Sequence, residues 1–160
     1  MTLEWSERYV SGYPEIDAQH CHLFELINHI NQINTIEELK PLLMLLYQHT
    51  REHFQQEEEL MRCAGFSGLD DHINGHNYLL ERLNAFSIEI GHGHFNKADL
   101  VKLMTDWAMN HIVRNDIPAL AFITKIKIDP LANAVPSAPA AKVNALHRQP
   151  FRGIPTRVPL

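Results

Sequence analysis

The sequence predicts an all-α protein, an antiparallel up-down-up-down four-helix bundle with an N-terminal arm and an irregular C-terminal tail. Three observations support this prediction. Apolar residues recur at helical spacing in four segments, residues typical of helix ends separate these segments, and no segment alternates with period two for long enough to form a strand. Four amphipathic helices joined by short connections pack as an antiparallel bundle.

The chain is expected to begin with an arm and a first helix. Residues 1–13 contain Trp5 and Tyr9, which supply enough apolar surface for the arm to pack on the domain. Pro14 suits the first turn of a helix, where its missing N–H costs no hydrogen bond. Apolar residues then recur at helical spacing, so we expect the first helix over residues 14–31.

The second helix has a clear start and a clear end in the sequence. The segment from Thr35 to Glu38 has the pattern of a capping box. Pro41 follows closely, so the regular part of the helix is expected to begin only near Lys40. Gly65 is a suitable residue just beyond the C-terminus of this helix.

The third and fourth helices follow a glycine-containing connection. The third is expected over residues 69–86, and Asn96 is expected to cap the fourth. Because proline interrupts the helical hydrogen-bond pattern, Pro118 should kink or end the fourth helix soon after Asp116.

Length and charge indicate one domain with an extension. We expect a folded domain over residues 1–129, with 10 basic and 19 acidic residues, and a basic, proline- and alanine-rich tail over residues 130–160. The composition of the tail favours a flexible extension with no fixed site, and the alternative is that its basic residues lie against the acidic body or a partner. An acidic body argues against nucleic acid as the main partner.

The sequence also predicts a compartment. No apolar run approaches the roughly 18 residues that a membrane span requires, so membrane insertion is not expected. The first residues lack the pattern of a secretory signal, so the expected compartment is the cytoplasm. There, Cys21 and Cys63 are expected to be free thiols.

Histidines and carboxylates at helical spacing are the candidate metal ligands. His53 and Glu57 stand four residues apart, as do His72 and His76, so each pair shares one face of its helix. A single pair of this kind is common on solvated helix faces. Two pairs on adjacent helices of one bundle favour a metal site between them.

The first and fourth helices complete the set. His20 lies at a position where, in an antiparallel pair, it faces His53. His111 and Asp116 are five residues apart, about 140° away from a common face in a regular α-helix. Both can reach one site only if the aspartate extends sideways or the helix is disturbed there.

These segments resemble the hemerythrins, specifically the bacterial single-domain members. The resemblance rests on Ile-Asp-Ala-Gln-His20, His53-Phe-Gln-Gln-Glu57, His72-Ile-Asn-Gly-His76 and the stretch from Trp107 to Asp116, and it spans roughly residues 5–127. It implies that His72, His76 and His111 bind one iron ion, that His20 and His53 bind a second, and that Glu57 and Asp116 bridge the two.

The resemblance also implies a function. Two iron ions, bridged by an oxo or hydroxo group, would bind dioxygen reversibly at an open position on the ion with two histidines. The chain would then carry, store or sense dioxygen without being an enzyme. The alternatives are a di-iron redox enzyme, such as a peroxidase, an oxidase or a nitric oxide scavenger, and an interaction module with a structural metal. No protein partner is indicated.

Residues beside the ligands complete the expectations. An apolar set is expected to form the wall of the dioxygen pocket, although each member also suits the bundle core: Leu23, Phe24, Phe54, Trp107 and Ile112. His49 shares a stripe with His53 and is the rival ligand, but His53 matches the family pattern. The other histidines are expected at the surface: His22, His29, His92, His94 and His147.

Overall fold

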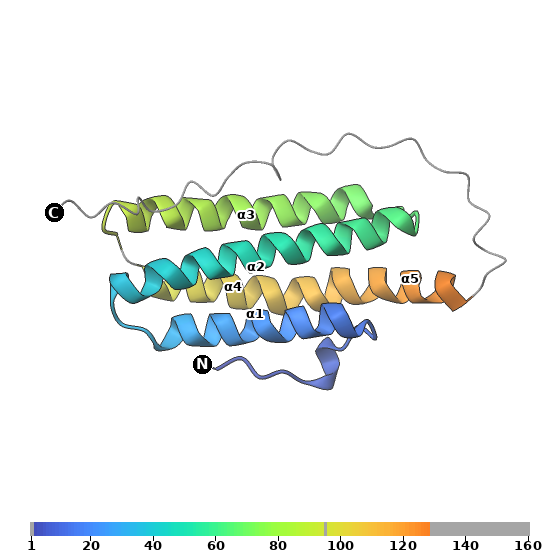
Figure 1. The fold of residues 1–160 in the computed structure, drawn as a ribbon, viewed down its shortest axis with the longest axis horizontal. Helices are drawn as coiled ribbons and strands as arrows, with labels where there is room; N and C mark the ends of the chain where they lie inside the picture. Colours follow the sequence, from blue (N-terminus) through green and yellow to red (C-terminus); the bar gives the residue numbers. More distant parts are fainter. Residues whose placement is uncertain (1, 95, 129–160) are drawn as a thin grey trace.

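The computed structural model describes residues 2–94 and 96–128, and over this part of the chain four rods of helix lie side by side (Figure 1). Helix α1 (Pro14–Gln32) packs against α2 (Ile36–Cys63), and α2 packs against α3 (Leu69–Gly91). Helix α4 (Lys97–His111) contacts both α1 and α3 and closes the bundle. The predicted all-α antiparallel four-helix bundle is confirmed. The tail expected over residues 130–160 lies outside the described residues.

The fourth rod of the bundle is composite. Helix α4 runs into a π-helical segment, η2 (Ile112–Asp116), which continues directly into α5 (Ile117–Ile128). In Figure 1 the three elements form one long rod. We expected Pro118 to kink or end the helix, but the rod does not end there. The departure from α-helical geometry precedes the proline, which then occupies the second position of α5, where a missing N–H is tolerated.

The N-terminal arm packs on the domain, as predicted, and it lies along α1 (Figure 1). It includes a short 3₁₀ turn, η1 (Glu7–Tyr9), and buries Leu3 and Tyr9. Asn28 of α1 holds the arm at both backbone atoms of Leu3: its Oδ1 accepts from the Leu3 N–H and its Nδ2 donates to the Leu3 carbonyl, each at 2.8 Å.

The start of α2 differs from the prediction in one respect. The capping box forms: the Thr35 Oγ1 accepts from the backbone N–H of Glu38 at 3.3 Å and donates to its Oε2 at 2.9 Å. The helix is nevertheless regular from Ile36 and includes Pro41, which is exposed. The prediction of a late start was wrong, because the cap already stabilises the first turn and the proline removes only one helical hydrogen bond.

The third helix is longer than predicted. It extends past the expected end at residue 86 to Gly91, because Ser87 and Ile90 continue its buried face. Two later signals were correct. Gly65, just after α2, has a positive φ of 66°, and the Oδ1 of Asn96 accepts from the backbone N–H of Asp99 at 3.1 Å at the start of α4.

Two apolar clusters form the core, and a polar layer separates them. The larger cluster fills most of the bundle and includes Leu23 of α1, Phe54 of α2 and Ile112 of η2. The smaller one consists of Ile16, Met61, Ala119, Leu120 and Ile123. On α1, α2 and the fourth rod the residues between these clusters are His20, Glu57 and Asp116, so the candidate ligands lie inside the bundle.

Two further predictions concern the described helices. Among residues 2–94 and 96–128, no helix has the length and apolar character that crossing a membrane requires. Cys21 is half-buried and Cys63 is exposed, and both are free thiols, as predicted.

Candidate metal centre

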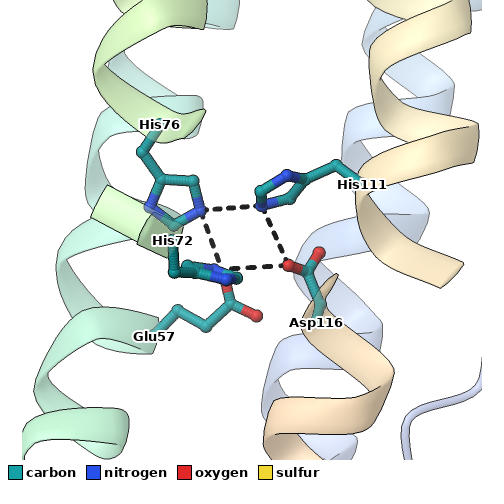
Figure 2. A group of neighbouring side chains, drawn as sticks. All are labelled: Glu57, His72, His76, His111 and Asp116. Atoms are coloured by element: carbon teal, nitrogen blue, oxygen red, sulfur yellow. Dashed lines mark hydrogen bonds and ion pairs between the residues drawn. The ribbon is translucent and has the colours of Figure 1, made fainter. Parts of the chain in front are cut away.

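All seven predicted ligands meet in the buried layer between the clusters. They form two groups in which one ligand atom of each residue lies within 4.8 Å of those of the others. The first group comes from α2, α3 and the fourth rod and is shown in Figure 2: Glu57, His72, His76, His111 and Asp116. The second adds α1: His20, His53, Glu57 and Asp116. The two carboxylates belong to both groups, so they lie between two potential metal positions.

Helix α2 presents His53 and Glu57 from successive turns. The His53 Nε2 lies 3.7 Å from the Glu57 Oε2, and both side chains are buried. Across the interface with α1, the rings of His20 and His53 have centroids 4.7 Å apart. The register expected from the sequence, in which residue 20 faces residue 53, is therefore confirmed.

Helix α3 presents His72 and His76 in the same way, with ring centroids 4.3 Å apart. Both Nε2 atoms point at the Glu57 Oε2, at 3.3 and 3.5 Å. The His72 Nε2 also lies 3.4 Å from the Asp116 Oδ1. The two imidazoles therefore converge on the space between the two carboxylates, as Figure 2 shows.

The spacing of His111 and Asp116 is accommodated by the π-helical segment. A π-helix bonds residue i to residue i+5, so residues five apart lie about one turn from each other. Segment η2 spans this interval, and the His111 Nε2 approaches the Asp116 Oδ1 to 3.0 Å. The local disturbance that the sequence required is thus a widened turn, which brings both side chains to the same side of the rod.

Several buried polar atoms of the site have no hydrogen-bond partner among the described residues. These atoms include the Nδ1 of His20 and the Oε1 of Glu57. Within the same part of the chain, the oxygens of Asp116 have only ion-pair contacts with histidine, at 3.2 Å from the His20 Nε2 and 3.0 Å from the His111 Nε2. In addition, the Nε2 atoms of His76 and His111 face each other at 3.0 Å, and two neutral imidazoles can share only one proton there. Unsatisfied buried polar groups are costly, and bound cations would satisfy them.

Burial keeps the imidazoles in the form that binds metal. It holds the pKa of His53 and His76 well below the usual value and lowers the pKa of His72 to about 4. These rings are therefore neutral at neutral pH, and a neutral ring has a lone pair available for a metal ion.

The two bridging candidates differ in their electrostatics. Burial, reinforced by Asp116 and Glu58, raises the pKa of Glu57 well above its usual range. Burial also acts to raise the pKa of Asp116, but His111 and His20 outweigh it and hold this pKa well below the usual range. A layer with two carboxylates and mostly neutral rings favours cations at its centre.

Three residues that contact the ligands were not predicted. The Nδ1 atoms of three ligand histidines have side-chain partners: Gln19 Oε1 at 2.9 Å from His53, Glu58 Oε1 at 2.8 Å from His76, and the amide of Asn115 at 2.9 Å from His111. Each partner is the sequence neighbour of a different ligand, namely His20, Glu57 or Asp116. This adjacency was visible, but which ring each residue contacts depends on how the helices pack.

Two of the expected wall residues stack on histidines of the first group. Phe54 stacks on His76, with centroids 3.5 Å apart, and Trp107 stacks on His111 at 4.2 Å. Leu23, Phe24 and Ile112 are buried in the same apolar cluster. Beside His20, the sequence interpretation missed an arm residue: the Trp5 ring lies 6.5 Å from the His20 ring and 5.6 Å from that of Phe24.

The remaining histidines largely follow the predictions. His49 is half-buried and belongs to neither ligand group; its Nε2 lies 2.9 Å from the backbone carbonyl of Gln19. His22, His29, His92 and His94 are exposed, as predicted, and His147 lies outside the described residues.

The chain is similar in sequence to proteins of a known family. The family model described as hemerythrin HHE cation binding domain matches residues 11–117. A bacteriohemerythrin of Pseudomonas aeruginosa is 30% identical over 117 residues, which cover 71% of this chain and 76% of that protein. A myohemerythrin of Theromyzon tessulatum is 26% identical over 113 residues, which cover 71% of this chain and 87% of that protein.

The fold has solved counterparts as well. A crystal structure of wild-type hemerythrin superposes with a TM-score of 0.72 and covers 78% of this chain and 99% of the other, at 21% identity. At that identity the likeness concerns the fold, whereas the family match includes the segments that carry all seven candidate ligands.

Proposed function

The chain belongs to the hemerythrin family, and we propose that it binds dioxygen reversibly at a pair of non-haem iron ions, for carriage, storage or sensing of the gas. The observation that carries the proposal is the presence of two buried ligand groups that share Glu57 and Asp116. The bacteriohemerythrin and myohemerythrin relatives support the same function.

The donor set suggests how the two ions would be held. His72, His76 and His111 would bind one ion, His20 and His53 would bind the other, and Glu57 and Asp116 would bridge them. The group of five residues then provides one protein ligand more than the group of four. The ion bound by His20 and His53 therefore has the more open coordination, and we assign the dioxygen position to it.

The iron pair and the protein would contribute different parts of dioxygen binding. A bound ferrous pair supplies the two electrons that dioxygen takes up and returns on release. The protein provides buried neutral imidazoles, carboxylates between the ions and an apolar enclosure that excludes water. We propose Leu23, Phe24, Phe54, Trp107 and Ile112 as the wall of this enclosure, with burial of four of them and partial burial of Trp107 in support. Exclusion of water slows the proton transfer that would turn binding into oxidation.

The bounds of the domain and the compartment of the protein are inferred from its sequence. We propose that residues 1–129 form the di-iron domain and that residues 130–160 are an appended tail. We further propose that the protein acts in the cytoplasm, without nucleic acid as a partner. Cell fractionation with an antibody against the domain tests the compartment.

The function is tested by reduction and reoxygenation. Aerobically purified protein should contain about two irons per chain, as in other di-iron bundles. After anaerobic reduction, air should produce a visible absorption band that disappears on degassing and returns in air. Rapid loss of the band with release of hydrogen peroxide would instead identify a redox enzyme, and one zinc without iron would refute the di-iron centre.

A further inference from the structure

The outer hydrogen-bond partners of the ligand histidines differ between the two groups. In the three-histidine group, the Glu58 Oε1 lies 2.8 Å from the His76 Nδ1, and both side chains are buried. In the two-histidine group, the Nδ1 of His53 lies 2.9 Å from an amide oxygen, the Oε1 of Gln19. The Nδ1 of His20 has no hydrogen-bond partner among the described residues.

These partners act on how strongly a ring binds a metal ion. A histidine that binds through Nε2 carries its proton on Nδ1 and donates that proton to the outer partner. Such a partner sets the tautomer and the ring orientation and increases the donor strength of Nε2. A carboxylate accepts a stronger hydrogen bond than a neutral amide does, so Glu58 and Gln19 are unequal partners.

We propose that Glu58 is a positioning residue that strengthens metal binding by the three-histidine group, and that Gln19 does the same more weakly for the two-histidine group. The difference in outer partners adds to the difference in ligand number. The inference rests on the proposed di-iron function, because it concerns the same two positions. The two metal positions would then form a graded centre, in which the ion bound by three histidines is held more tightly than the ion that binds dioxygen.

Helix α2 offers a matched control for Glu58. The next residue, Glu59, is also a glutamate of α2. Its side chain is exposed, and it pairs with Arg62 at 2.6 Å. Glu58→Gln keeps the size of the side chain and an oxygen that can accept from His76, whereas Glu58→Leu removes the acceptor. Gln19→Leu removes the acceptor from the other group.

The experiment measures the two stepwise affinities of the full-length metal-free protein for Co²⁺ in competition with a chelator. We expect Glu58→Gln to weaken the tighter step by about tenfold and Glu58→Leu by up to about a hundredfold, which is the usual range for outer partners. Gln19→Leu should weaken the looser step and leave the tighter one unchanged. Glu59→Gln should alter neither step.

A second measurement separates positioning from packing. In the zinc-loaded protein, the Nδ1 proton of His76 should give a strongly downfield proton resonance, and this resonance should move upfield in Glu58→Gln. A Glu58→Gln protein with the affinities and the His76 resonance of Glu59→Gln would overturn the inference. If Glu58→Leu does not fold without metal, the comparison of Glu58→Gln with Glu59→Gln still tests the role of Glu58.

Different results would refute the di-iron function and the role of Glu58. A wild-type protein that binds no second metal ion would refute the di-iron function, and with it the graded centre. A wild-type protein that binds two ions, with equal affinities in Glu58→Gln and Glu59→Gln, would refute only the role of Glu58.

Discussion

The bundle contains an apolar end and a polar middle, and they are stabilised differently. At the apolar end, where α2 and α4 begin and α3 finishes, fully buried leucines such as Leu39, Leu43 and Leu83 fill the core. In the polar middle, five histidines and two carboxylates occupy equally buried positions, and several of their polar atoms have no hydrogen-bond partner among the described residues. The apolar end is complete without a ligand, whereas the middle contains unsatisfied polar atoms that bound cations would satisfy.

The largest expected effect in the polar middle comes from Glu57→Ala, which removes a carboxylate shared by both groups. Iron should be lost from both positions together, and the melting temperature should fall to that of the metal-free wild type, because metal binding and folding are linked. Iron analysis and thermal unfolding by circular dichroism measure the two effects.

The metal-free proteins provide the control for this variant. Without metal, Glu57→Ala should be about as stable as the wild type, since it removes the unsatisfied Oε1 of Glu57 together with the contact between its Oε2 and His72. A variant that keeps one iron, or that is much less stable than the wild type without metal, would contradict the bridging role.

The corresponding change at the apolar end is Leu43→Ala. This side chain is fully buried, so the cavity should lower the free energy of unfolding by about 2–5 kcal/mol. The loss should be the same with and without metal, and the iron content should stay at the wild-type level. Denaturant titrations of both forms test this. A loss confined to the metal-loaded form would show that the two regions are not independent.

At the border of the two regions, Trp107→Ala should affect dioxygen chemistry more than metal content. The indole stacks on the His111 ring at 4.2 Å, so its removal should let water approach the centre while all ligands remain. We expect iron retention near the wild-type level and a several-fold faster loss of the dioxygen band in air. Trp107→Phe is the matched control and should show a smaller change. Unchanged decay in both variants would remove Trp107 from the proposed wall.

His49→Ala should have a small effect. His49 lies outside both ligand groups, and its Nε2 lies 2.9 Å from the Gln19 carbonyl. Loss of this single hydrogen bond should cost about 1 kcal/mol and leave the iron content unchanged. An empty site in His49→Ala together with a filled site in His53→Ala would reverse the ligand assignment.

The smallest expected effect is that of truncation after Pro130. The tail is rich in proline and alanine and contains no acidic residue, a composition that favours an extension with no fixed site. Iron content, the dioxygen band and the melting temperature should all remain nearly unchanged. A loss of several degrees or much faster oxidation in air would show that the tail covers part of the bundle.

Local signals in the sequence were sufficient to predict the four rods and most of their ends. The capping box at Thr35, the cap at Asn96 and the glycine at position 65 act within one turn, so their effect is visible without the fold. The same holds for His53 with Glu57 and for His72 with His76, because α-helical spacing places each pair on one face.

Other features depended on packing between elements and could not be predicted locally. Ser87 and Ile90 extend α3 because they continue a face that is buried by other helices. The alignment of His111 with Asp116 required η2, a widened turn for which the sequence indicated the need but not the form. The contacts from Gln19 to His53 and from Glu58 to His76 cross between helices. A sequence neighbour of a ligand points about 100° away from it around the helix, so only the arrangement of the bundle decides which ring it meets.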